Sequence, residues 1–151
     1  MSDSSGNEWQ PVADTGFGNL LGPILTRRVE GKLEFGLQLR EHHENVLGRI
    51  HGGLLATLAD STLGWTIMDE LGNSEPSVTI QLDLQFLDAA NAGEFITSSA
   101  RVIRRSRHLV FAEGSLHVEG RHVLRVSGIW KVLERSRMAE MALGKIGNVQ
   151  G

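Results

Sequence analysis

The sequence predicts an α+β fold in which a curved antiparallel sheet wraps around one long central helix. Three observations support this prediction. A single long helical segment lies between two strand-like segments and four further ones. The helical segment carries apolar residues on several faces, so other structure must enclose it. The strand-like segments are separated by turn residues, which is typical of antiparallel pairing.

The chain begins with a polar segment and then becomes strand-like. Residues 1–16 are predicted to form a mobile N-terminal segment. Within and just after it, Trp9–Leu21 mixes Gly, Asp and Pro with a few apolar residues, which indicates a short docking helix or a loop. Strands are predicted over Ile24–Glu30 and Lys32–Arg40, because apolar and polar residues alternate in the second segment. We expect these strands to form a hairpin with one solvent-exposed face.

The central helix is predicted from Gly52 to Leu71, where Gly72 and Asn73 end it. Its apolar run, residues 54–68, is too short to cross about 30 Å of hydrocarbon comfortably, and Asp60 lies within it. We therefore interpret this helix as a core element.

Four more strands are predicted after the helix, and they cover Ser77–Leu87, Glu94–Ile103, His108–Glu119 and Arg121–Leu133. One apolar face of the first strand is expected to consist of Ile80, Leu82, Leu84 and Phe86. These strands complete a single domain over residues 17–133, followed by a C-terminal tail over residues 134–151.

Two glycines interrupt the apolar faces of the last two strands. Gly114 lies in the third strand after the helix and Gly128 in the fourth. Such small residues would let a thick helix approach the sheet closely.

Composition excludes several classes of function. The net charge of −3 and pI near 6.1 provide no basic field for nucleic acid or an anionic membrane. Without cysteine there is no thiolate nucleophile and no thiolate-bound metal. The first ten residues lack a secretory signal, which predicts a cytoplasmic protein. The run His42-His43-Glu44 lacks ligand spacing on one face and is interpreted as a polar turn rather than a metal site.

The start of the helix is a candidate oxyanion hole. Gly52 and Gly53 are poor helix formers, so their position requires a reason. The first amide N–H groups of a helix have no internal partner, and the dipole end is positive. These amides would stabilise a carbonyl oxygen that gains negative charge. The alternative is that the glycines merely allow tight helix packing.

Asp60 is the candidate reactive group. An acidic residue in an enclosed apolar helix is costly unless it is paired or functional, although a structural Asp bonded to Thr57, Ser61 or a partner chain is an equal alternative. Eight residues separate Gly52 from Asp60, so their backbones lie roughly 12 Å apart at 1.5 Å per residue. One helix cannot readily use both groups on one carbonyl, whereas two antiparallel copies can. We therefore predict a twofold dimer with shared sites.

The segment resembles the helix-start motif of hotdog-fold acyl-CoA thioesterases of the phenylacetate-degradation (PaaI-like) type. The matching residues are Asn45, Gly48, His51, Gly52, Gly53 and Asp60. The resemblance covers roughly residues 17–133 and implies the hotdog fold and hydrolysis of an acyl-CoA thioester to free acid and coenzyme A. It implies a homodimer that pairs again into a tetramer, with no metal or further cofactor. Arg49 and Ala89-Ala90 depart from the family pattern and affect only loop detail.

By resemblance, Asp60 is the nucleophile or the general base that activates water, and the Gly52 amide polarises the thioester carbonyl. Asn45 would position the water or the carbonyl, His51 would support that loop, and Thr79 would assist the acid. Taken without the motif, these last three residues would instead be a turn residue, a helix cap and an ordinary strand residue.

The same resemblance suggests where the substrate binds. Gly53 would contact the substrate, and His51 would also support the thioester end. A basic cluster would bind the nucleotide end of coenzyme A; it consists of Arg101, Arg104, Arg105, Arg107 and His108. Trp65, Phe86 and Leu87 either line the acyl pocket or belong to the core. Two rival functions remain open at this point: a hotdog enoyl or hydroxyacyl thioester hydratase or dehydratase, and a non-catalytic acyl-CoA binding module.

Overall fold

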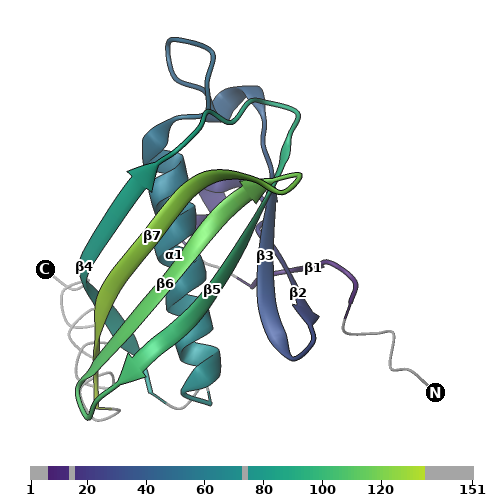
Figure 1. Cartoon of the computed structure of the whole chain (residues 1–151). Coiled ribbons are helices and arrows are strands. Elements are labelled where there is room, and N and C mark those ends of the chain that lie inside the picture. Colours follow the sequence, from purple (N-terminus) through teal and green to yellow (C-terminus); the bar gives the residue numbers. More distant parts are fainter. Residues whose placement is uncertain (1–6, 14–15, 73–74, 135–151) are drawn as a thin grey trace, which may run out of the picture.

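The computed structural model of the protein describes residues 7–13, 16–72 and 75–134. Within these residues it contains one α-helix, α1 (Gly52–Glu70), and seven strands (Figure 1). The strands are β1 (Gln10–Pro11), β2 (Leu25–Val29), β3 (Lys32–Gln38), β4 (Ser77–Phe86), β5 (Phe95–Arg105), β6 (Leu109–Val118) and β7 (Arg121–Val132). Two short 3-10 helices complete the description, η2 (Gly16–Leu21) and η3 (Glu41–His43).

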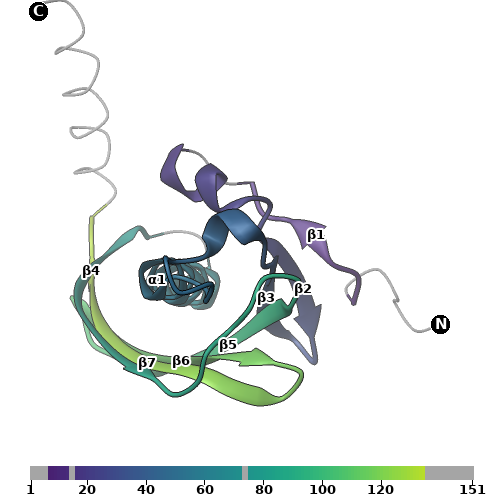
Figure 2. The ribbon, with the colours of Figure 1, turned by 90° about the horizontal axis from the view of Figure 1, so that it is seen from above.

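The strands form one antiparallel sheet in the order β1-β2-β3-β5-β6-β7-β4. The strand that follows the helix, β4, is therefore added at the far edge, next to the last strand of the chain. Seen along the helix, the sheet curls around α1 from β4 to β3 (Figure 2). This arrangement confirms the predicted hotdog architecture, and both β2–β3 and the four later strands begin or end within about two residues of their predicted positions.

The core fills the space between the concave face of the sheet and α1. From the helix it includes Leu58, Leu63 and Ile67, and from the sheet it includes Leu116 and Trp130, each at most 1% exposed. Burying several large side chains of this kind, at about 1.5–3 kcal/mol each, provides the main driving force for wrapping the sheet around the helix. The helix side that bears Asp60, Ser61 and Gly64 is only half-buried, so a single chain does not enclose α1 completely.

Part of the segment predicted to be mobile belongs to the sheet instead. β1 pairs with β2 through Gln10 and Thr26. The Trp9 ring packs edge-on against Phe95 with ring centroids 5.3 Å apart, and the Arg27 guanidinium lies 4.4 Å from the Trp9 ring centre. Residues 1–6 and 135–151, which include most of the predicted tails, lie outside the described residues.

Gly114 in β6 and Gly128 in β7 lack a side chain for a reason other than the predicted close approach of the helix. A Cβ on Gly128 would lie 2.6 Å from the carbonyl oxygen of Gln81 and 2.8 Å from the Trp130 ring. A Cβ on Gly114 would lie 2.6 Å from the carbonyl oxygen of Ser99. The close neighbours are thus adjacent strands and a core indole, not α1.

Candidate active site

Asp60 and Thr79 are in direct contact, as the prediction of a catalytic acid with a strand partner requires. The Thr79 hydroxyl donates a hydrogen bond to Asp60 Oδ1 at 2.7 Å. Asp60 lies near the middle of α1 and is half-buried, while Thr79 lies near the start of β4. Among the described residues, Oδ2 of Asp60 has no hydrogen-bond partner, so this oxygen is available to a water molecule or a substrate.

A β-bulge turns Thr79 toward the helix. In the register between β4 and β7, Thr79 pairs with Trp130, whose side chain is buried, while Gln81 pairs with Ile129. The extra residue, Ile80, shifts the alternation of the strand, so that Thr79 and Leu82 both face inward. The predicted apolar face of β4 is therefore wrong at Ile80, which is 56% exposed.

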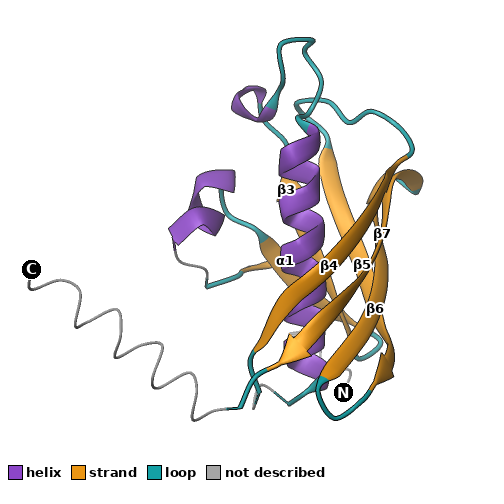
Figure 3. Cartoon of the chain, turned by 90° about the vertical axis from the view of Figure 1, so that its left-hand side faces the viewer, coloured by secondary structure: helices purple, strands orange, loops and turns teal. Residues whose placement is uncertain are grey.

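A groove of about 430 Å³ opens beside Asp60. It lies between η2, α1 and the first residues of β4, and Figure 3 shows η2 beside the helix. Its walls include the apolar side chains of Phe17, Trp65 and Val78, the backbone of Gly64, and the hydroxyls of Ser61 and Ser77. Among the described residues, Asp60 is the only charged one that lines the groove. A carboxylate in an accessible recess can act as a general base or as a nucleophile.

The backbone amides of the two glycines at the start of α1 differ in whether they are already hydrogen-bonded. His51 is the N-cap of α1, and its Nδ1 accepts a hydrogen bond from the Gly53 amide at 2.9 Å. A Cβ on Gly53 would lie 3.0 Å from that nitrogen, so a glycine at position 53 makes room for the cap. The Gly52 N–H has no hydrogen-bond partner among the described residues. The structure thus leaves the Gly52 amide free to bind an oxyanion, while the Gly53 amide, predicted to contact substrate, is already used by His51.

Asn45 shapes the loop before the helix. Its side-chain oxygen accepts hydrogen bonds from the amides of Leu47 at 2.8 Å and Arg49 at 3.3 Å, and its own amide donates to the Arg49 carbonyl at 2.7 Å. This is the turn role that served as the alternative reading of Asn45. Nδ2 of Asn45 has no partner within the described part of the chain, so the side chain retains a donor for water or a carbonyl.

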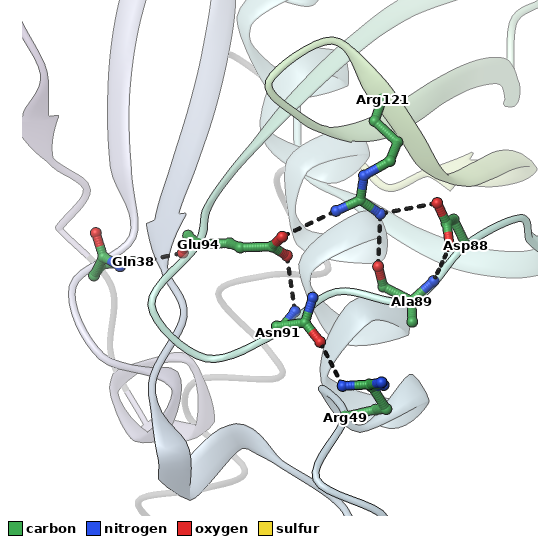
Figure 4. A network of polar contacts seen from close by, with 7 residues as sticks. All are labelled: Gln38, Arg49, Asp88, Ala89, Asn91, Glu94 and Arg121. Atoms are coloured by element: carbon green, nitrogen blue, oxygen red, sulfur yellow. Dashed lines mark hydrogen bonds and ion pairs between the residues drawn. The ribbon is translucent and has the colours of Figure 1, made fainter.

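A polar network holds this loop against the segment that follows β4 (Figure 4). Arg49 Nη1 donates to Asn91 Oδ1 at 2.9 Å, and the Asn91 amide donates to Glu94 Oε2 at 2.8 Å. Arg121, the first residue of β7, donates to Glu94 Oε1 at 3.0 Å and to Asp88 Oδ2 at 3.0 Å. The contacts with Arg121 and the adjacent Ala89 amide hold the pKa of the Asp88 carboxyl below its usual value. We call the residues Arg49, Asp88, Asn91, Glu94 and Arg121 the loop clamp.

The two halves of the predicted site lie apart within one chain. Gly52, His51 and Asn45 gather at the start of α1, whereas Asp60 and Thr79 meet near its middle. A rise of about 1.5 Å per residue puts Gly52 and Asp60 roughly 12 Å apart along the helix. The aromatic ring of Phe86 lies 3.4 Å from the position of a Cβ on Gly52, at the opposite end of β4 from Thr79.

Of the three residues considered for the acyl pocket, only Trp65 lines the groove beside Asp60. Phe86 lies at the helix start, and Leu87 lines a separate hollow that also includes Asp83 and Arg125. These residues could not be separated by sequence spacing, because their positions depend on the path of β4 along the helix.

The basic cluster surrounds the β5–β6 turn, at the end of the sheet near Glu75. Arg101 is paired with Glu113, and Arg105 with Glu75. Arg104, Arg107 and His108 are exposed, and within the described residues the side chains of these three make no ion pair. The cluster therefore retains cationic groups that are able to meet an anion.

The imidazole of His43 is hydrogen-bonded at both ring nitrogens. It is 4% exposed, its Nδ1 accepts from the Arg40 amide at 3.0 Å, and its Nε2 lies 2.8 Å from the Leu21 carbonyl oxygen. Burial lowers the pKa of this imidazole, although the hydrogen bond to Leu21 opposes the shift. Among the described residues no group of three or more His, Cys, Asp or Glu side chains is placed to hold a metal ion. Nor does this part of the chain contain a helix that is long and apolar enough to cross a membrane.

Comparison of the sequence with protein families and with known proteins identifies thioesterases and esterases as its relatives. The thioesterase superfamily model matches residues 47–124. A Pseudomonas aeruginosa protein named as a putative esterase is 35% identical over 113 residues, which cover 74% of this chain and 84% of that protein. Human acyl-coenzyme A thioesterase 13 is 32% identical over 116 residues, which cover 70% of this chain and 81% of that protein.

A solved structure supports the same assignment of fold. The chain is similar to a phenylacetic acid degradation-related protein from Ralstonia eutropha, with a TM-score of 0.70 and 27% sequence identity. The match covers 80% of this chain and 92% of that protein. The family resemblance predicted from residues 45–60 is thereby confirmed.

Proposed function

This chain belongs to the thioesterase superfamily, and we propose that its thioesterase activity hydrolyses an acyl-CoA to a free acid and coenzyme A. The name of the human relative supports coenzyme A as the thiol. The observation that carries the proposal is the Asp60 carboxylate, which lines a groove and accepts the Thr79 hydroxyl through one of its two oxygens. With no cysteine in the sequence a thiolate nucleophile is excluded, and Asp60 is the group we assign to attack the thioester or to activate water.

Asp60 acts as a nucleophile or as a general base. As a base, it takes a proton from water while the water oxygen bonds to the thioester carbon, and the thiol then leaves as the tetrahedral intermediate collapses. As a nucleophile, its oxygen bonds to the thioester carbon, the C–S bond breaks and the coenzyme A thiolate leaves; water then hydrolyses the resulting mixed anhydride to the free acid and restores Asp60. In both routes negative charge develops on the carbonyl oxygen, and the Gly52 amide is the free donor that would stabilise it.

Each site uses two subunits. One subunit contributes Asp60 and Thr79, and its twofold partner contributes Gly52, with Asn45 and His51 in support. The separation of about 12 Å along α1 supports this arrangement, because one chain does not bring both groups to one carbonyl. The half-buried side of α1 and the free edge of β4, where Ile80 is exposed, provide a surface for the partner. Two such dimers pair into a tetramer.

Coenzyme A is held by its anionic end. Arg104, Arg105, Arg107 and His108 bind its phosphates, for which guanidinium groups are suited. Gly53 contributes by keeping the His51 cap in place, which holds the Gly52 amide toward the thioester.

The assay is thiol release from aryl-CoA and aliphatic acyl-CoA substrates, comparing the wild type with Asp60→Asn. The variant keeps the size of the side chain and an acceptor for Thr79 but removes the base or nucleophile. We expect turnover by the wild type and loss of most of it in the variant. Wild-type turnover in folded Asp60→Asn would refute the role of Asp60, and no turnover with any ester would favour a binding module.

The shared site is tested by mixing two inactive variants, Asp60→Asn and Gly52→Pro, whose proline lacks the amide hydrogen. Random pairing makes half of the dimers hybrids, and each hybrid holds one intact site out of two, so activity should return to about one quarter of the wild-type value. Confirmed hybrids without activity would show that each site lies within one chain.

A further inference from the structure

Gly64 occupies a helix position where nothing in the described part of the chain requires glycine. It lies inside α1, where glycine costs about 1 kcal/mol relative to alanine. Its backbone φ is not positive, so other residues could adopt the same conformation. A Cβ at this position would meet no atom within 4 Å. Neither backbone strain nor packing within the described structure therefore accounts for the missing side chain.

The space left by Gly64 belongs to the groove beside Asp60. Gly64 follows Asp60 by four residues, which places both on the same face of the helix, one turn apart. The groove continues from Asp60 and Thr79 past Gly64 to Trp65 and Phe17. Any side chain at position 64 would fill this space next to the reactive carboxylate.

The chemistry of the groove walls suits an uncharged group. Phe17, Trp65 and Val78 supply apolar surface, and the Trp65 ring is supported from behind by Phe35 at 5.2 Å between centroids. Among the described residues that line the groove, Asp60 is the only charged one. No described lining residue is a cation that would pair with an anionic nucleotide, whereas the apolar walls suit a hydrocarbon chain or ring.

We propose that Gly64 determines the size of the acyl group that the enzyme accepts. The acyl chain beyond the thioester carbon runs along α1 over Gly64 and packs between Trp65 and Phe17. A side chain at position 64 would close the groove and leave room only for short acyl groups. This inference rests on the proposed hydrolysis of acyl-CoA at Asp60.

The test compares Gly64→Ala and Gly64→Leu with the wild type on acetyl-, butyryl-, octanoyl-, palmitoyl- and benzoyl-CoA. We expect Gly64→Leu to lower kcat/KM by on the order of ten- to a hundredfold for octanoyl-CoA and larger acyl groups, with little change for acetyl-CoA. Gly64→Ala should give a smaller change of the same pattern. Met68→Leu, one turn further along α1 and outside the groove, is the matched control and should keep the wild-type profile.

Several outcomes would overturn the inference. An unchanged profile in Gly64→Leu would show that the acyl group lies elsewhere. An equal loss for every acyl length would place the pantetheine arm, rather than the acyl group, over Gly64. A change in sedimentation of Gly64→Ala would assign the glycine to contact between subunits.

The failure of the inference is distinguishable from failure of the proposed function. If the wild type hydrolyses none of the esters, the proposed function fails, and the groove is then tested by calorimetric binding of octanoyl-CoA to the wild type and Gly64→Leu. Equal affinities would refute the role of Gly64, and weaker binding by the variant would support it.

Discussion

Replacing Gly52 with proline removes one hydrogen atom from the candidate oxyanion hole and little else. Proline is favoured at the first position of a helix, because its missing N–H has no helical partner there. The residue before a proline must be extended, and His51 already has φ −62° and ψ 130°. A Cβ at position 52 would lie at an ordinary contact distance of 3.4 Å from the Phe86 ring. The helix should therefore form as before.

The expected loss can be estimated from the free amide. Among the described residues the Gly52 N–H is the amide at the helix start that neither the His51 cap nor the helix uses. Removing one preorganised oxyanion donor typically costs about 10²–10³ in kcat, or roughly 2.7–4 kcal/mol of transition-state stabilisation. We expect a loss of this order for Gly52→Pro, with a smaller change in KM because the donor acts mainly on developing charge.

Gly52→Ala is the matched control, because it adds a side chain at the same place but keeps the amide hydrogen. Steady-state thiol release gives kcat and KM for both variants, and thermal unfolding shows whether each is folded. A folded Gly52→Pro variant with kcat within about threefold of Gly52→Ala would refute the assignment of the Gly52 amide as an oxyanion donor.

Two further predictions concern stability. Gly128→Ala should destabilise the fold by about 1–3 kcal/mol, because its Cβ would overlap the Gln81 carbonyl and the Trp130 ring. Gly64→Ala adds the same methyl group into open space within a helix and should therefore raise the Tm. Equal Tm values for the two variants would contradict this reasoning. Stability should also fall as the pH drops below about 6.5: burial lowers the pKa of His43 in the folded state, so the unfolded chain binds more protons in acid. The fall in Tm between pH 7.5 and 5.5 should be smaller in His43→Gln than in the wild type. Part of the fall should remain, because burial and the charge of His122 also lower the pKa of His117. An unchanged fall in Tm would exclude His43 as a cause of the pH dependence.

The elements of the fold could be predicted because local pattern and tertiary role agree in them. The central helix ends one residue before its predicted end, and β4 begins at the predicted Ser77. Asp60 and the glycine pair were identifiable because each conflicts with local preference, a carboxylate among apolar residues and glycine inside a helix start. Conflicts of this kind point to function or to an unseen contact.

The bulge in β4 has no comparable sequence signal. Strict alternation places Ile80 with Leu82, and only the pairing with β7 shows that one extra residue is present. The consequence is functional, since without the bulge Thr79 would face away from Asp60. Strand β1 was missed for a related reason: it is two residues long, contains Pro11 and is held by Trp9 contacts that only the folded chain provides.

The loop clamp could not be predicted from sequence, because its members are far apart along the chain. Arg49 and Asn91 are 42 residues apart, and Arg121 and Asp88 are 33 residues apart. Each of these residues alone is typical of an exposed turn. The family resemblance marked Arg49 only as a departure from the usual pattern. The hydrogen bond from Arg49 to Asn91 supplies the reason for an arginine at this position.

The loop clamp also fixes when during synthesis the helix start can become ordered. A nascent chain that has emerged as far as α1 already contains Asn45, His51 and Gly52, yet Asn91 and Arg121 have not been made. Loop closure over such separations has an entropic cost that only the completed β6–β7 hairpin can offset. A chain that stalls before residue 121 therefore carries every group of the reactive centre, while the loop before α1 lacks the contacts that support it. The ability to process substrate is acquired only after residue 121 has been synthesised.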